Sequence, residues 1–152
     1  MTAAGRPDRL TGIRLAAVRS VTDKQVRHWF REPAGAIGAL TEDLVLLWRH
    51  HRTDDLGERR IGTLELASGG YLQWIGYSDA LAVECSSNAY LSRSGRLSAQ
   101  DEATLVRAGF SRPGDGGDNP NFGLGVHDEA DCARAAFSVV AVLTAVFGVY
   151  AG

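Results

Sequence analysis

The sequence has little of what most catalytic and metal-binding sites need. Its 152 residues include two cysteines, Cys85 and Cys132, and four histidines. These residues form no CxxC, HxxxH or HExxH pattern, the spacings that bring zinc ligands together. No GxSxG or SxxK sequence marks a nucleophile, and the glycine runs at 114–117 and 123–125 lack the full spacing of phosphate-binding loops. We therefore expect no catalytic residue, no metal and no cofactor.

Basic charge is also scarce. Lys24 is the only lysine, and 16 basic residues against 18 acidic ones give a formal net charge of −2. A domain that binds nucleic acid normally carries a clustered basic face, so nucleic acid is not an expected partner. The first 20 residues lack the continuous apolar core and the cleavage site of a signal peptide, which predicts a cytoplasmic protein. Both cysteines have apolar neighbours, which predicts buried free thiols.

Long apolar runs are absent except at 135–152, which is uncharged. A membrane span needs about 20 strongly apolar residues, whereas this run contains Ser138, Thr144 and five alanines. Three interpretations remain open: a helix in the core of the monomer, a helix at a dimer interface, and a tail anchor. We favour the first two, because the run is too weakly apolar for a bilayer.

The N-terminal part of the chain predicts helices. Residues 1–12 are polar and expected to be flexible. Thr22 and Gln25 have the spacing of a capping box, which predicts a short helix that stops at Pro33. A second, amphipathic helix is predicted over 39–51 from the helical spacing of Leu40, Leu44, Leu47 and Trp48.

After residue 60 the apolar period changes to two. Residues 61–66, 71–77 and 81–86 predict three consecutive strands joined by short turns, an antiparallel meander. One face of this sheet would carry the inner set, which is Leu64, Leu66, Leu72, Trp74, Leu81, Val83 and Cys85. The opposite face would carry a mixed set, which is Thr63, Glu65, Tyr71, Gln73, Ile75, Ala82 and Glu84.

The C-terminal part predicts a helix, a strand and a helix. Ser98 begins a helix that ends at Gly109, residues 111–120 form a loop, and residues 121–127 form a weaker strand. A long helix over 129–147 follows, capped by Asp128 and ended by Gly148. The predicted order is α-α-β-β-β-α-β-α, an α+β fold in which an antiparallel meander packs against helices.

One domain over residues 13–152 accounts for this pattern. Its first part, 13–60, is predicted to be helical, and its second part, 61–149, contains the sheet and the C-terminal helices. The length is typical of a single domain that buries its own core.

Several short segments resemble a known family. Ser87-Asn88 follows the hairpin, Leu97-Ser98 precedes a helix and Gly109-Phe110 follows it, Asn121-Phe122 precedes the last helix, and Phe147-Gly148-Val149 ends it. Over residues 69–149 this order is similar to the YbjN-like, type III secretion chaperone-like (TY-Chap) proteins of actinobacteria. The resemblance implies a twisted antiparallel sheet packed on helices, often a homodimer, and a role in holding peptide segments of client proteins.

The resulting hypothesis is a non-catalytic peptide- or protein-binding module. An extended segment would bind on the mixed sheet face or at its edge, and the candidate binding residues are Tyr71, Gln73, Ile75, Glu84 and Asn88. The small polar run Ser86-Ser87-Asn88 also fits a strand end whose side chains satisfy backbone groups. Two alternatives remain: a small-molecule-binding protein or enzyme with a site around His127, Glu84 and Arg112, and a structural oligomerisation subunit whose contact surface is the apolar C-terminal helix.

Overall fold

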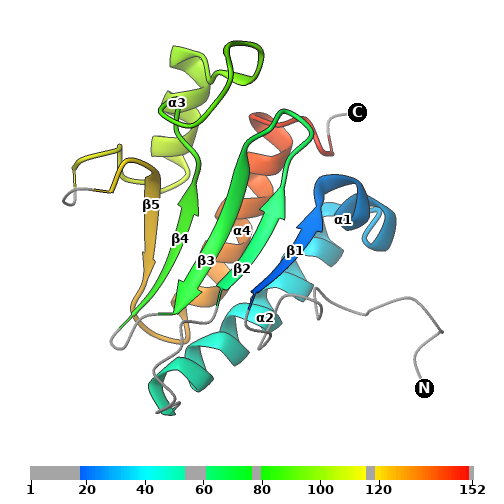
Figure 1. The fold of residues 1–152 in the computed structure, drawn as a ribbon. Helices are drawn as coiled ribbons and strands as arrows, with labels where there is room; N and C mark the ends of the chain where they lie inside the picture. Colours follow the sequence, from blue (N-terminus) through cyan, green and yellow to red (C-terminus); the bar gives the residue numbers. More distant parts are fainter. Residues whose placement is uncertain (1–17, 54–60, 77–79, 116–118, 151–152) are drawn as a thin grey trace.

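The computed structural model describes residues 18–53, 61–76, 80–115 and 119–150 (Figure 1). The predicted flexibility of residues 1–12 lies outside this range. The elements in chain order are β1 Val18–Thr22, α1 Asp23–Trp29, α2 Pro33–Thr53, β2 Ile61–Glu65, β3 Tyr71–Gly76, β4 Leu81–Cys85, the 3-10 turn η1 Arg93–Gly95, α3 Ala99–Arg107, β5 Phe122–Val126 and α4 Asp131–Ala145.

The five strands form one sheet in the order β1-β2-β3-β4-β5. β2, β3, β4 and β5 pair with one another in antiparallel fashion, which confirms the predicted α+β fold and the predicted order of its elements. β1 is an additional strand, parallel to β2, that the sequence did not reveal. Its residues, Val-Arg-Ser-Val-Thr, do not alternate between apolar and polar, so they lack the signal of a half-buried strand.

Local capping sets the starts of two helices. The Thr22 side chain accepts a hydrogen bond from the Gln25 backbone N–H at 3.2 Å, and the Gln25 side chain accepts one from the Thr22 backbone N–H at 2.9 Å. Ser98 and Asp101 make the same reciprocal pair at the start of α3, with both distances 3.0 Å. Both predicted helix starts are therefore confirmed, because a capping box satisfies two free N–H donors of the first turn.

The prediction for α2 was wrong about where the helix begins. α1 does end before Pro33, but Pro33 is also the first residue of α2, which was expected only from residue 39. Proline suits the first helical position because its fixed backbone angle is helical and its missing N–H would have no partner there. Ala36 and Ala39 in this early part of the helix are buried, so packing supports the extra turns.

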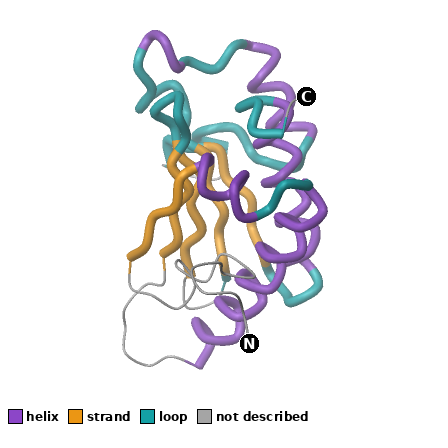
Figure 2. The backbone as a smooth tube through the Cα atoms, turned by 90° about the vertical axis from the view of Figure 1, so that its right-hand side faces the viewer, coloured by secondary structure: helices purple, strands orange, loops and turns teal. Residues whose placement is uncertain are grey.

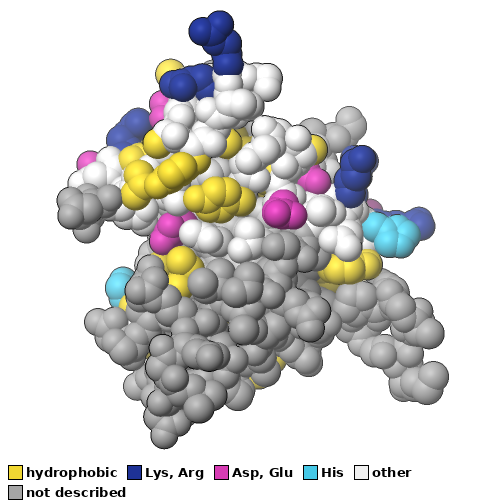
Figure 3. All heavy atoms as spheres, in the orientation of Figure 1, with side chains coloured by type: hydrophobic (Ala, Val, Ile, Leu, Met, Phe, Trp, Pro, Cys, Tyr) yellow, Lys and Arg dark blue, Asp and Glu magenta, His cyan; other side chains and the backbone are white. Residues whose placement is uncertain are grey.

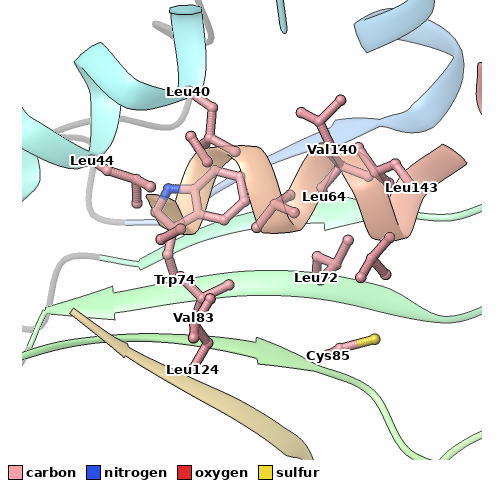
Figure 4. Close-up of a cluster of buried hydrophobic side chains, with 14 of the residues drawn as sticks. Leu40, Leu44, Leu64, Leu72, Trp74, Val83, Cys85, Leu124, Val140 and Leu143 are labelled. Atoms are coloured by element: carbon pink, nitrogen blue, oxygen red, sulfur yellow. The ribbon is translucent and has the colours of Figure 1, made fainter. Parts of the chain in front are cut away.

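The helices α2 and α4 cover one face of the sheet, as Figure 2 shows from the side. Every residue of the predicted inner set is buried on this face. Trp74 points from β3 toward Leu40 and Leu44 of α2 (Figure 4). The register pairs Trp74 with Val83 of β4, which in turn pairs with Leu124 of β5, so a continuous apolar layer crosses the sheet.

Most of the described part of the apolar C-terminal run, residues 135–150, lies in this core. α4 begins at Asp131, two residues later than predicted, and the Asp128 side chain accepts a hydrogen bond from the Asp131 N–H at 2.8 Å. Ala135, Val139 and Val142 are buried against the sheet and α2. The turn after the helix uses Gly148 with φ of 69°, a left-handed conformation that glycine adopts readily. Of the helices described, none has the length and hydropathy that a bilayer crossing requires.

Candidate peptide-binding face

The sheet face opposite α2 and α4 carries the candidate residues. We call it the outer face; on β2 to β5 it consists of Thr63, Glu65, Tyr71, Gln73, Ile75, Ala82, Glu84, Gly123 and Gly125. Figure 3 looks onto this side and shows acidic side chains near the middle of its described part, with basic side chains toward the rim. The described helices α2 and α4 lie on the other side of the sheet, so neither of them covers this face.

Burial differs among the candidate residues of the outer face. Tyr71 and Gln73 are half-buried, as expected for side chains on an open sheet. Ile75 and Glu84 are each only 7% exposed, which alternation alone does not predict. In the register Ile75 pairs with Ala82 of β4, so an apolar side chain lies beside it. A charged residue at position 75 would therefore disturb packing as well as binding.

Three of the candidates, Tyr71, Gln73 and Glu84, meet Asn121 in a network of four residues that we call the polar cluster. Glu84 Oε1 accepts a hydrogen bond from Gln73 Nε2 at 3.3 Å and one from Asn121 Nδ2 at 3.2 Å. Asn121 Nδ2 also donates to the Tyr71 hydroxyl oxygen at 3.0 Å. The register places Gln73 directly opposite Glu84, so adjacent strands present the two side chains together.

Asn121 positions the polar cluster. Its Oδ1 accepts from the Ser87 backbone N–H at 3.2 Å, so both ends of the amide have partners. The sequence reasoning did not include Asn121 among the candidates. Residue 121 begins the weaker predicted strand 121–127 and belongs to the Asn121-Phe122 pair of the family resemblance, and that pair was the one available signal of a special role.

Ser86 and Ser87 hold the end of β4. The Ser86 Oγ accepts a hydrogen bond from the Tyr71 backbone N–H at 2.9 Å, and the Ser87 Oγ donates to the Pro120 carbonyl at 2.5 Å. Ser87 Oγ also accepts from the Ala89 N–H. These contacts agree with the interpretation of the run as a strand end whose side chains satisfy backbone groups.

The Asn88 side chain makes its hydrogen bonds outside the polar cluster. Its side chain bonds both backbone groups of Leu97, which closes the loop between β4 and α3. Asn88 also lines an open hollow of about 580 Å³ together with Glu102, Asn119 and Pro120. A second hollow, of about 520 Å³, lies where the outer face meets the start of α1, and Tyr71, Glu65 and Lys24 are among its lining residues.

The residues proposed for an alternative site come from β4, from the loop before β5 and from the chain after β5. The His127 ring lies over Gly125 on β5, where an added Cβ would be 2.7 Å from Nε2. Arg112 is exposed in the loop before β5. The two thiols are buried, and this burial raises the pKa of Cys85 to about 12 and that of Cys132 to about 11. Within the described residues, no group of three or more His, Cys, Asp or Glu side chains is arranged to hold a metal ion.

Comparison with known proteins identifies a family. A search of curated proteins finds nothing similar, and neither does a search of solved structures. The model of one family, described as T3SS (YopN, CesT) and YbjN peptide-binding chaperone 3, matches residues 39–151. This match begins within α2, so it covers more of the chain than the segments that first suggested the resemblance. Because the match extends over most of the sequence, the chain belongs to the TY-Chap3 family of peptide-binding chaperones.

Proposed function

We propose that this protein is a non-catalytic, chaperone-like module that binds an extended peptide segment of a client protein on its outer face. The observation that carries the proposal is the polar cluster, which is ordered on the sheet face that α2 and α4 do not cover. A flat sheet face with ordered donors and acceptors suits an extended peptide, whose own polar groups recur along its length. Membership of a peptide-binding chaperone family supports the same interpretation.

The candidate residues have different proposed roles. The Tyr71 hydroxyl accepts from Asn121 and keeps its own hydrogen for a client carbonyl. Gln73 keeps its side-chain oxygen as an acceptor. Ile75 supplies a mostly buried apolar edge, Glu84 supplies a carboxylate, and Asn88 fixes the loop beside the hollow that it lines with Glu102.

Substitution of Gln73 by arginine tests the proposal. Gln73 is half-buried on the outer face, so a longer charged side chain would obstruct the face while extending into solvent. We expect Gln73→Arg to lose most peptide capture from a displayed random-sequence library while its melting temperature stays close to that of the wild type. The matched control is Gln100→Arg, which makes the same change at an exposed position of α3. Equal capture by all three proteins would contradict the proposal.

A homodimer is a second proposal, and Phe137 favours it. This side chain is 62% exposed on α4, although most of the helix is buried. Ala133 and Ala141 lie one turn to either side, and such small residues leave room for an aromatic side chain from another copy. We expect Phe137→Lys to lower the mass measured by light scattering from that of a dimer to that of a monomer. A wild-type protein that is already a monomer would refute this proposal.

We also propose that residues 13–152 form a single domain that works in the cytoplasm. One cluster of buried apolar residues runs from Val26 in α1 to Val149 after α4, which supports a single domain. Both cysteines are free thiols, the state that a reducing compartment maintains. Limited proteolysis tests the first point, and a fluorescent fusion in the native host tests the second.

A further inference from the structure

We infer that the outer face selects its clients by a basic side chain, arginine or lysine, that forms an ion pair with Glu84. This inference rests on the proposed peptide-binding function and adds the chemical class of the residue that is recognised. It follows from the burial of Glu84, its hydrogen bonds, the charge of the surrounding strands and the open space beside it.

Glu84 is a carboxylate with an incomplete set of partners. It is only 7% exposed, and its two hydrogen bonds, from Gln73 and Asn121, both end on Oε1. Within the described part of the chain, no lysine, arginine or histidine forms an ion pair with it, and Oε2 accepts no hydrogen bond. Buried carboxylates are normally paired with a cation, because loss of water is costly for an isolated charge.

The strands around Glu84 favour a positive ligand. β2 to β5 contain two glutamates, Glu65 and Glu84, and no lysine or arginine. Both glutamates belong to the outer face. A surface with this charge attracts basic side chains and disfavours acidic ones.

Space for the incoming group lies over β5. Glu84 pairs with Gly123 in the register, and a Cβ added at Gly123 would meet no described heavy atom within 4 Å. A glycine directly beside the carboxylate therefore leaves an opening at the level of the sheet. On the other side, Gln73 pairs with Glu84 and keeps its Oε1 as a further acceptor.

These acceptors suit a guanidinium or ammonium group. Both cations only donate hydrogen bonds, and Glu84 Oε2 and Gln73 Oε1 only accept them. Charge-assisted hydrogen bonds of this kind are stronger than neutral ones. The rest of the client would lie as an extended strand on the outer face, with the Tyr71 hydroxyl donating to one of its carbonyls.

Synthetic peptides with one variable residue test the inference. The probes are acetylated and amidated nine-residue peptides of alternating valine and threonine, with arginine, citrulline, lysine, norleucine or glutamate at the centre. Citrulline and norleucine keep the approximate shapes of arginine and lysine without the charge. Binding to the full chain is measured by titration in low salt.

We expect the arginine and lysine peptides to bind about tenfold or more tightly than their neutral counterparts, since an unpaired buried charge weakens a complex strongly. Glu84→Gln keeps an acceptor for Gln73 and Asn121 and removes the charge, so it should remove this preference. The control Glu65→Gln, which changes the exposed glutamate of the same face, should keep it.

A second variant keeps the inference testable if Glu84→Gln fails to fold. Gly123→Val fills the opening and leaves Glu84 in place, and it should also weaken the basic peptides selectively. If all five peptides bind the wild type equally well, the inference is overturned and the peptide-binding function stands. If none of the peptides binds, the inference and the proposed peptide-binding function of this face are both overturned. A preference that survives in both Glu84→Gln and Gly123→Val would overturn the inference alone.

Discussion

The Asn88 side chain bonds both polar backbone groups of Leu97. Its Oδ1 accepts from the Leu97 N–H at 2.7 Å, and its Nδ2 donates to the Leu97 carbonyl at 3.0 Å. A side-chain amide thereby replaces the pair of hydrogen bonds that a neighbouring strand would supply. Leu97 itself is buried and immediately precedes Ser98, the capping residue of α3. The contact therefore fixes the position of α3 relative to the end of β4.

We predict that Asn88→Ala lowers the free energy of unfolding by about 1–3 kcal/mol, because it leaves two backbone groups of Leu97 without partners. Denaturation by urea measures the effect. Ser92→Ala, an exposed substitution in the same loop, serves as the control and should change stability little. A loss of peptide capture by Asn88→Ala with unchanged stability would instead make Asn88 a direct client contact.

Two glycines of the sheet should respond differently to alanine. A Cβ at Gly62 would lie 2.5 Å from Trp74 Nε1 and 2.8 Å from Cε2, and Trp74 is 1% exposed, so its ring has little room to move. We predict that Gly62→Ala costs about 1–3 kcal/mol of unfolding free energy, as overpacked cores do. Gly123→Ala is the matched change in open space and should be close to neutral. Thermal melts of the two variants would contradict this prediction if they were equal.

Acid should reduce the stabilisation that the Asp131 carboxylate gives to the start of α4. A hydrogen bond from the His127 backbone N–H to Asp131 and a contact with Arg134 lower the pKa of the Asp131 carboxyl below its ordinary value of 3.8. A lowered folded-state pKa means that the stabilisation is complete above the ordinary value and is lost as the pH falls through the lowered one. We predict that wild type is more stable than Asp131→Asn at pH 7.

The stability difference between wild type and Asp131→Asn should shrink once the pH falls below 3.8. Urea denaturation at pH 7 and at a pH below 3.8 measures this stability difference. Asp115→Asn, in the exposed loop before β5, provides the matched control and should have little effect at either pH. A difference that is independent of pH would show that the charge of Asp131 contributes nothing.

High pH should destabilise the folded protein through its two buried thiols. Burial raises the pKa of Cys85 from 9.0 to about 12 and that of Cys132 from 9.0 to about 11. A raised folded-state pKa means that their contribution is present below pH 9 and is lost as the pH rises toward 11 and 12, because the unfolded chain ionises first. The free energy of unfolding of Cys85→Ala should therefore fall less steeply above pH 9 than that of the wild type.

Thiol labelling gives an independent measurement. At pH 8 the folded protein should react very slowly with a disulfide reagent, and two thiols should react after unfolding in urea, because thiolates in solution are the reactive species. Rapid labelling of either cysteine in the folded protein would contradict the burial that both the core and the alkaline prediction depend on.

Local patterns explain which parts of the fold could be predicted. The inner set of the sheet and the capping boxes at Thr22 and Ser98 each depend on residues two to three positions apart, so the sequence reveals them directly. β1 could not be found in this way. Its role as a strand depends on pairing with β2, a partner beyond α1 and α2, and its own residues show no alternation.

The same distinction applies to the candidate site: local patterns predicted some of its features, and long-range contacts determine the others. Alternation assigned Tyr71, Gln73 and Glu84 to a common face, and the register brings Gln73 and Glu84 opposite each other. The burial of Glu84 and the contacts of Asn121 depend on loops distant in sequence. Asn121 meets Tyr71, Glu84 and Ser87 only after β5 has joined the sheet, and no spacing in the sequence encodes that meeting.

The parallel pairing of β1 has a consequence for how the chain assembles. β2, β3 and β4 are joined as consecutive hairpins, whose ends close short loops at low entropic cost. β1 must instead wait until α1 and α2 have brought it back beside β2, a contact between residues far apart along the chain. It would join the sheet late and open early, with faster amide hydrogen exchange than β3. A molecule that has released β1 would still keep a complete four-stranded meander.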